Sequence, residues 1–139
     1  MQAPLSTPPH DTPSQGQRSS IKRRTASFGF ALLGIRALVA TQVHARFHLA
    51  ASIGVVAAGL YFGLAPWEWA SVLLAIGGVW MAEALNTALE LLVDLVHPAW
   101  HERAGIIKDL AAGAVLLFAC AALGVALVVF GPRILSLVG

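Results

Sequence analysis

The sequence carries little charge and almost no cysteine. Of its 139 residues, only 12% are charged and 58% are hydrophobic. Soluble domains carry about a quarter charged residues, so this composition excludes an ordinary soluble protein and indicates an integral membrane protein. The single cysteine, Cys120, excludes an intrachain disulfide. One cysteine and five scattered histidines also lack the ligand spacing of a structural zinc site.

Other signals are missing as well. The glycine-rich phosphate-binding motif Gly-x-x-x-x-Gly-Lys-Ser/Thr does not occur, so any nucleotide site must be built differently. Basic residues form one short cluster, Lys22-Arg23-Arg24, beside an apolar segment, which indicates anchoring to anionic lipid and no nucleic-acid partner. Residues 1–18 are rich in Pro, Ser, Gln and Thr, which predicts a disordered tail without the apolar core of a signal peptide.

Residues 19–139 are predicted to form an all-α membrane domain. A basic, partly apolar segment at about 19–45 predicts an amphipathic helix on the membrane surface. Apolar segments at about 47–64, 69–96 and 106–130 predict three transmembrane helices. Residues 65–69 are expected to form the turn between the first two, and Gly131-Pro132 is expected to end the third.

Lysine and arginine residues predict the orientation of these helices. They precede the first span and flank the loop after the second, whereas the 65–69 turn has none and the C-terminal tail has only Arg133. By the positive-inside rule, the N-terminus and the 97–108 loop are expected in the cytoplasm and the C-terminus outside.

A polar stripe interrupts the second predicted span. Glu83, Asn86, Glu90 and Asp94 fall within roughly 80° of arc when each helical residue turns about 100°. Ionisable residues inside a membrane are costly and are therefore functional candidates. The alternative is a helix end whose charges simply reach the cytoplasm.

Lys108-Asp109 opens the third span, across the loop from Glu90 and Asp94. A lysine near a helix start suits an anion such as phosphate. The alternative is that Lys108 extends to the interface and pairs with Asp109 or Asp94. Carboxylates that could hold Mg²⁺, next to a lysine for phosphate, are the parts that phosphoryl transfer requires.

These residues resemble a known signature. Glu83-Ala84-Leu85-Asn86-Thr87-Ala88-Leu89-Glu90, followed by Val93-Asp94, His101 and Lys108-Asp109, is similar to the prokaryotic diacylglycerol kinase and undecaprenol kinase family. The resemblance covers roughly residues 20–130. It implies a homotrimer of three-span protomers in the bacterial cytoplasmic (inner) membrane. It also implies an ATP- and Mg²⁺-dependent lipid kinase that acts on undecaprenol or diacylglycerol, and the outer Trp67-Glu68-Trp69 slightly favours undecaprenol.

The resemblance also implies a role for each matched residue. Glu83 would be the general base that deprotonates the lipid hydroxyl, and Glu90 would hold Mg²⁺ with the ATP phosphates. Asn86 and Ala112 would bind the lipid, and Asp94 would support the site near the nucleotide. The other positions that match the ATP site are Arg23, Phe30, Gln42, Ala99, Trp100, His101, Lys108 and Asp109.

One position departs from the family pattern. Gln42 stands where the family usually has a metal-binding glutamate, and a neutral amide oxygen is a weaker ligand for Mg²⁺ than a carboxylate. Retained kinase activity is the prediction, either with a more loosely held metal or with compensation by His44 or a neighbouring residue. One alternative is a non-catalytic membrane protein that has kept the fold, and another is a small transporter. The stripe occupies only one half of its helix, which argues against transport.

Overall fold

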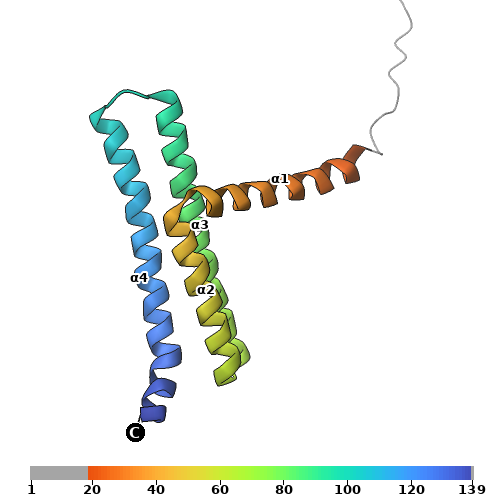
Figure 1. Ribbon diagram of the computed structural model, residues 1–139, viewed down its shortest axis with the longest axis vertical. Coiled ribbons are helices and arrows are strands. Elements are labelled where there is room, and N and C mark those ends of the chain that lie inside the picture. The colour runs from red at the N-terminus through yellow and green to blue at the C-terminus, as the bar shows by residue number, and fades with distance from the viewer. Residues whose placement is uncertain (1–18, 139) are drawn as a thin grey trace, which may run out of the picture. The chain divides into compact units, whose positions relative to one another are not determined.

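The computed structural model describes the backbone of residues 19–138 and the side chains of residues 27–137. Its four helices are α1 (Ser19–Thr41), α2 (Val43–Phe62), α3 (Pro66–Val96) and α4 (Glu102–Val138), shown in Figure 1. The expected all-α fold is therefore confirmed. The chain divides into two units, residues 1–34 and residues 35–139. The tail expected at residues 1–18 lies outside the described residues.

The described part of the first unit is helix α1 up to Gly34. Its large apolar side chains, Phe28, Phe30, Leu32 and Leu33, are all exposed. Exposed aromatic and aliphatic side chains on a single helix are typical of a segment that contacts lipid or another protein surface. A location on the membrane surface stays a prediction for this helix.

Helices α2, α3 and α4 are each long and apolar enough to cross a membrane, which confirms the three expected spans. The shortest, α2, has 20 residues, and a helix of that length covers the roughly 30 Å of a bilayer core. Leu74 and Leu95 on α3 and Leu117 on α4 point their side chains outward and are largely exposed. Lipid tails are as apolar as leucine, so such exposure carries no penalty in a bilayer.

Helix α3 runs antiparallel to α4 and packs mainly against it, with a smaller contact to α2 (Figure 1). The buried core of this arrangement consists of Leu64, Val72, Val129 and Phe130. Phe62 at the end of α2 reaches the same core, with its ring centroid 6.2 Å from that of Phe130. The core therefore lies at the end of the bundle where α2 turns into α3, which we call the turn end.

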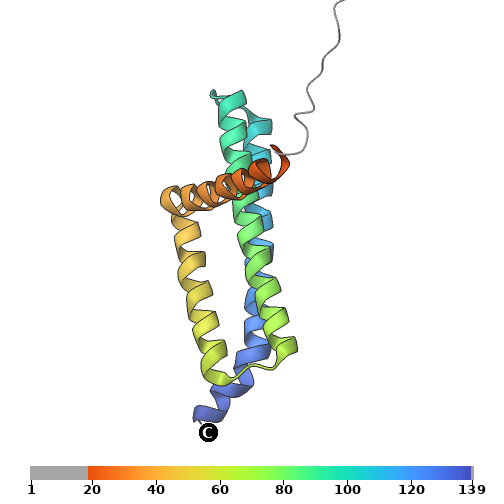
Figure 2. The ribbon, with the colours of Figure 1, turned by 90° about the vertical axis from the view of Figure 1, so that its right-hand side faces the viewer.

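A short turn at residues 63–65 joins α2 to α3 (Figure 2). Gly63 adopts φ 63°, a left-handed conformation that glycine reaches without strain, and the Leu64 N–H donates to the Gly59 carbonyl at 3.1 Å. Pro66 is the first residue of α3, where its missing N–H would have no helical partner. The expected turn at 65–69 is therefore shorter than predicted, because Trp67, Glu68 and Trp69 already belong to α3.

An ion pair links the start of α3 to the end of α4. Arg133 donates from Nη1 to Glu68 Oε1 at 2.9 Å and from Nη2 to Glu68 Oε2 at 2.7 Å, and the Ala65 N–H donates to the same carboxylate at 2.8 Å. Glu68 is only 6% exposed. Two parallel charge-assisted bonds have both strength and fixed geometry, so this pair sets the register of α3 against α4 at the turn end.

The expected end of the third span at Gly131-Pro132 is wrong, because α4 continues through Pro132 to Val138. Proline removes one backbone N–H, which deprives the Val128 carbonyl of its helical donor. The neighbouring turn is held by Arg133, whose Nη1 donates to the Val129 carbonyl at 2.6 Å while it pairs with Glu68. The tertiary ion pair thus stabilises a helical turn that local propensity alone would end.

The first span begins earlier than predicted. Gln42 alone is extended, with φ −99° and ψ 122°, and α2 starts at Val43. Arg46, one turn into α2, donates from Nε to the Val39 carbonyl and from Nη2 to the Ala40 carbonyl, at 3.0 and 2.5 Å. These two carbonyls lie in the last turn of α1, where helical donors run out. Arg46 therefore caps α1 and fixes the corner between residues 39 and 46.

Gly59→Ala is expected to lower the melting temperature of the detergent-solubilised protein. A Cβ at Gly59 would lie 2.7 Å from Trp69 Cη2 and 2.9 Å from Leu64 Cδ1, and overpacking of this kind typically costs about 1–3 kcal/mol. Gly54→Ala is the matched control on the same helix, since a Cβ there meets nothing within 4 Å. The control should leave the melting temperature unchanged or raise it, because alanine favours the helix. Equal melting temperatures for the two variants would contradict the close packing at Gly59.

Candidate active site

The polar stripe lies on α3 as one face, but its members differ in burial. Glu83 is 3% exposed, Asn86 and Glu90 are half-buried, and Asp94 is exposed. The stripe therefore runs from a buried position in the middle of α3 toward the exposed connection at residues 97–101. We call that end of the helix pair the loop end.

Glu83 is a buried carboxylate without a protein partner. No hydrogen bond or ion pair of its side chain is found within residues 27–137, the part of the chain with described side chains. The other buried carboxylate of α3, Glu68, has three donors. The residue is buried as a whole, although its carboxylate oxygens are not among the fully buried atoms without a partner. An unpaired carboxylate at such a position is unfavourable for folding. This makes it the strongest candidate for chemistry on the stripe.

Asn86 orients Glu90. Its Nδ2 donates to Glu90 Oε1 at 3.1 Å, and its own Oδ1 is buried without a hydrogen-bond partner among the described side chains. No set of three or more His, Cys, Asp or Glu side chains in the described part of the chain could enclose a metal ion. Mg²⁺ commonly uses one or two carboxylates and completes its shell with water and substrate phosphates. The oriented Glu90 carboxylate fits such a site.

Lys108 pairs with Asp94 across the two helices. The Nζ–Oδ1 distance is 2.5 Å, and the side chains are 36% and 62% exposed. The pairing with Asp94 that the sequence left open is therefore confirmed. Exposed ion pairs contribute little stability, so the lysine can still exchange this partner for a phosphate oxygen. Asp109, the next residue, is exposed.

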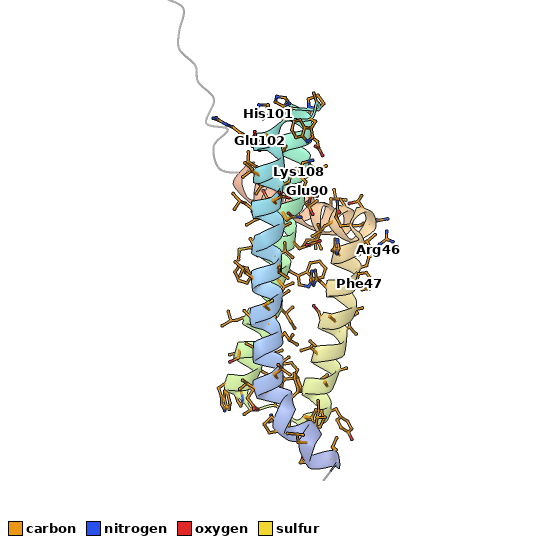
Figure 3. All side chains as sticks on the ribbon, turned by 90° about the vertical axis from the view of Figure 1, so that its left-hand side faces the viewer. Arg46, Phe47, Glu90, His101, Glu102 and Lys108 are labelled. Atoms are coloured by element: carbon orange, nitrogen blue, oxygen red, sulfur yellow. The ribbon has the colours of Figure 1, made fainter. Side chains whose placement is uncertain are left out.

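A cavity of about 300 Å³ opens at the loop end. It brings together five of the predicted site residues, which are Asp94, Ala99, Trp100, His101 and Lys108. Figure 3 shows His101 and Glu102 at the loop end, with Lys108 and Glu90 further along the helices. A pocket of this size, with charged and aromatic walls, is at the lower limit of ordinary small-ligand sites.

The hydrogen bonds of His101 fix which ring nitrogen carries its proton. The Arg103 backbone N–H donates to His101 Nδ1 at 3.2 Å, so Nδ1 accepts and the neutral ring carries its proton on Nε2. His97 lies beside it, with ring centroids 4.8 Å apart. His101 thus caps the start of α4 and retains one N–H that can donate to a ligand.

Four predicted site residues are not among the residues that line this cavity. Gln42 is half-buried between α1 and α2, and its side chain makes no capping bond to α2. Ala112 is exposed on α4, and Phe30 is exposed on α1 in the first unit. The side chain of Arg23 lies outside the described residues. Their roles in binding stay predictions.

An apolar cavity of about 240 Å³ lies between α2, α3 and α4. Val79, one helical turn before Glu83, is part of its wall, and the remaining wall is mostly alanine and aliphatic side chains. Its polar lining residues are His48 and Ser52, and the Ser52 hydroxyl accepts from Trp80 Nε1 and donates to the His48 carbonyl, at 3.1 and 2.7 Å. The cavity therefore suits a hydrocarbon chain.

Sequence reasoning overlooked Thr87. It is 7% exposed, and its Oγ1 has no hydrogen-bond partner among the described residues. The signal was available, because Thr87 lies about 40° from Glu83 around the helix and so belongs to the stripe. Because threonine carries no charge, the stripe was defined only from residues with carboxylate or amide side chains.

Comparison with known proteins places these residues in a wider context. The family profile described as prokaryotic diacylglycerol kinase matches residues 29–130. The chain is 37% identical over 121 residues to a protein of Bacillus subtilis (strain 168) named undecaprenol kinase, and the aligned region covers 87% of this chain and 98% of that relative. It is 42% identical over 112 residues to a Synechocystis sp. protein named diacylglycerol kinase, and the aligned region covers 80% of this chain and 64% of that relative.

The two buried glutamates of α3 should respond oppositely to the same substitution. Glu83→Gln is expected to leave the melting temperature unchanged or raise it, because it removes an unpaired buried carboxylate. Glu68→Gln should lower the melting temperature, because it leaves the half-buried Arg133 guanidinium without its carboxylate. Thermal unfolding in one detergent measures both variants. A larger loss of stability in Glu83→Gln than in Glu68→Gln would show that Glu83 is paired in the folded protein.

Proposed function

Because the chain belongs to the prokaryotic diacylglycerol kinase family and is thus a lipid kinase, we propose that it transfers the γ-phosphate of ATP to a membrane lipid alcohol, either undecaprenol or diacylglycerol. The observation that carries the proposal is the buried, unpaired carboxylate of Glu83, one turn beyond an apolar cavity. An alcohol whose hydrocarbon chain occupies the membrane can present its hydroxyl to that carboxylate.

Glu83 acts as the general base in this proposal. The lipid hydroxyl gives its proton to the Glu83 carboxylate while its oxygen forms a bond to the γ-phosphorus. The bond from the γ-phosphorus to the β–γ bridging oxygen breaks, and ADP leaves with that electron pair. General-base catalysis contributes about 10²–10⁴-fold to such reactions, and most of the remaining rate comes from positioning and charge neutralisation.

Glu90 and Lys108 handle the phosphate charge. Glu90, oriented by Asn86, would hold Mg²⁺, which neutralises charge on the ATP phosphates when it is bound. Lys108 would exchange Asp94 for an oxygen of the transferring phosphate, with Asp109 beside it. The exposure of the Lys108–Asp94 pair supports this exchange, since an exposed ion pair contributes little stability.

The nucleotide is proposed to bind at the loop-end cavity. His101 Nε2–H can donate to it, and the neighbouring Ala99 and Trp100 line the same space. Arg23, Phe30 and Gln42 complete the proposed set of nucleotide contacts. Asn86 and Ala112 are proposed on the lipid side, where small and neutral groups leave room for a headgroup.

The loop end is proposed to face the bacterial cytoplasm, with the C-terminus outside. The basic residues before α2 and around the 97–108 loop support this orientation, and ATP is then available on the same side. A homotrimer in the inner membrane is proposed as the assembly. The small residues Ala111, Ala112, Gly113 and Ala114 permit close helix contacts.

The purified protein in lipid is expected to transfer labelled phosphate from ATP to undecaprenol or diacylglycerol when Mg²⁺ is present. Glu83→Gln should lower kcat by about 10²-fold or more, because it removes the base. Its affinity for an ATP analogue should remain unchanged, since Glu83 does not line the loop-end cavity. Wild-type protein that binds ATP but phosphorylates neither alcohol would favour the non-catalytic alternative.

Gln42→Glu is expected to lower the Mg²⁺ concentration for half-maximal activity, because it restores a carboxylate where a neutral amide now stands. The readout is a magnesium titration at saturating ATP, repeated as Mg²⁺-dependent protection of the protein by an ATP analogue. Gln42→Ala serves as the control for loss of the amide oxygen. If all three proteins required the same Mg²⁺ concentration, position 42 would not contribute to the metal site.

A further inference from the structure

The buried hydroxyl of Thr87 has no function in the fold. It is 7% exposed and its Oγ1 is unpaired among the described residues. A buried hydroxyl without a hydrogen bond is a free-energy cost to the folded state. Valine has nearly the same shape without that cost. The hydroxyl therefore needs an explanation outside the chain's own hydrogen bonding.

Other hydroxyls of this protein show what a helical hydroxyl ordinarily does. Thr41, Ser52 and Ser71 each donate to the backbone carbonyl four residues earlier, at 2.8, 2.7 and 3.0 Å. This local bond is the usual solution for serine and threonine inside helices. The corresponding acceptor for Thr87 is the carbonyl of Glu83, and that bond is not made. The Thr87 hydroxyl therefore lacks the local bond that the other three hydroxyls make.

The position of Thr87 relative to Glu83 suits one shared ligand atom. Four helical residues rise about 6 Å, so an oxygen midway between the two side chains would lie roughly 3 Å from each, which is hydrogen-bond distance. An ionised carboxylate only accepts hydrogen bonds, whereas the threonine hydroxyl can donate one. An alcohol can use both groups, because its O–H donates to the carboxylate and its oxygen accepts a hydrogen bond from the threonine hydroxyl.

Burial does not separate the two residues. Glu83 and Thr87 are both buried, at 3% and 7% exposure, as is their neighbour Ala82 on the same helix. An alcohol that reaches the Glu83 carboxylate therefore lies within one helical turn of Thr87.

We infer that Thr87 is a further substrate-contacting residue, whose hydroxyl donates a hydrogen bond to the lipid alcohol oxygen that Glu83 deprotonates. The inference rests on the proposed lipid kinase function. Thr87 keeps its own proton throughout the reaction. The lipid oxygen uses one lone pair to attack the γ-phosphorus, gives its proton to Glu83, and accepts from Thr87 with the other lone pair. Thr87 thereby fixes the direction of the attacking lone pair.

Thr87→Val tests this, with Thr87→Ser as the conservative control that keeps the hydroxyl. One neutral hydrogen bond corresponds to about tenfold, so kcat/KM for the lipid alcohol should fall about tenfold or more in Thr87→Val. The KM for ATP should stay within about twofold, and Thr87→Ser should retain most of the wild-type kcat/KM. The melting temperature of Thr87→Val should be unchanged or higher, because an unpaired buried hydroxyl is removed.

Binding of the alcohol without ATP separates this inference from the proposed function. A short-chain diacylglycerol or polyprenol in mixed micelles should raise the melting temperature of wild type and Thr87→Ser more than that of Thr87→Val. Equal stabilisation of all three, or a kcat/KM for Thr87→Val equal to that of wild type, would overturn the role of Thr87. A lower melting temperature for Thr87→Val would overturn it too, by showing a structural partner. Alcohol binding without any phosphate transfer would sink the kinase function while leaving the Thr87 contact in place.

Discussion

The structure depends on how α3 accommodates two carboxylates inside an apolar helix. Glu68 and Glu83 are both buried, and both must be reconciled with a surrounding that disfavours charge. Glu68 has a bidentate arginine and a backbone donor, so it contributes to the fold. Glu83 has no partner among the described residues. One helix therefore carries a structural carboxylate near its start and, further along, the carboxylate that we propose for chemistry. The number of hydrogen-bond donors to each carboxylate distinguishes the two.

An ion pair links α3 to α4 at each end of the helix pair, and the two ion pairs differ in burial. Glu68–Arg133 is largely buried at the turn end, whereas Asp94–Lys108 is exposed at the loop end. A buried bidentate pair resists exchange because its charges cannot return to water without disrupting the packing. An exposed pair exchanges partners at small cost. The register of α3 against α4 is thus fixed at the turn end, while the residues proposed to meet phosphate stay available.

Sequence periodicity predicted the three spans and the stripe, because both depend on local hydrophobicity and on helical angles. It could not predict the continuation of α4 through Pro132, since that turn is held by a contact between residues 68 and 133. The early start of α2 likewise depends on Arg46 bonds to residues 39 and 40. The difference in burial between Glu83 and Asp94 also could not be predicted from helical angles alone. Each of these differences depends on tertiary contacts, which the sequence pattern does not contain.

Unpaired polar atoms are not scattered through this molecule. Within the described side chains, the fully buried oxygens that lack a partner are Asn86 Oδ1 and Thr87 Oγ1, and both lie within about one turn of the Glu83 carboxylate, which also makes no hydrogen bond. Other polar side chains in the described part of the chain have partners, as Trp80 has in Ser52 and Arg133 has in Glu68. Random defects of packing would not gather on two turns of one face. Complementarity to an external polar group would explain the clustering, and the lipid hydroxyl of the proposed reaction is such a group.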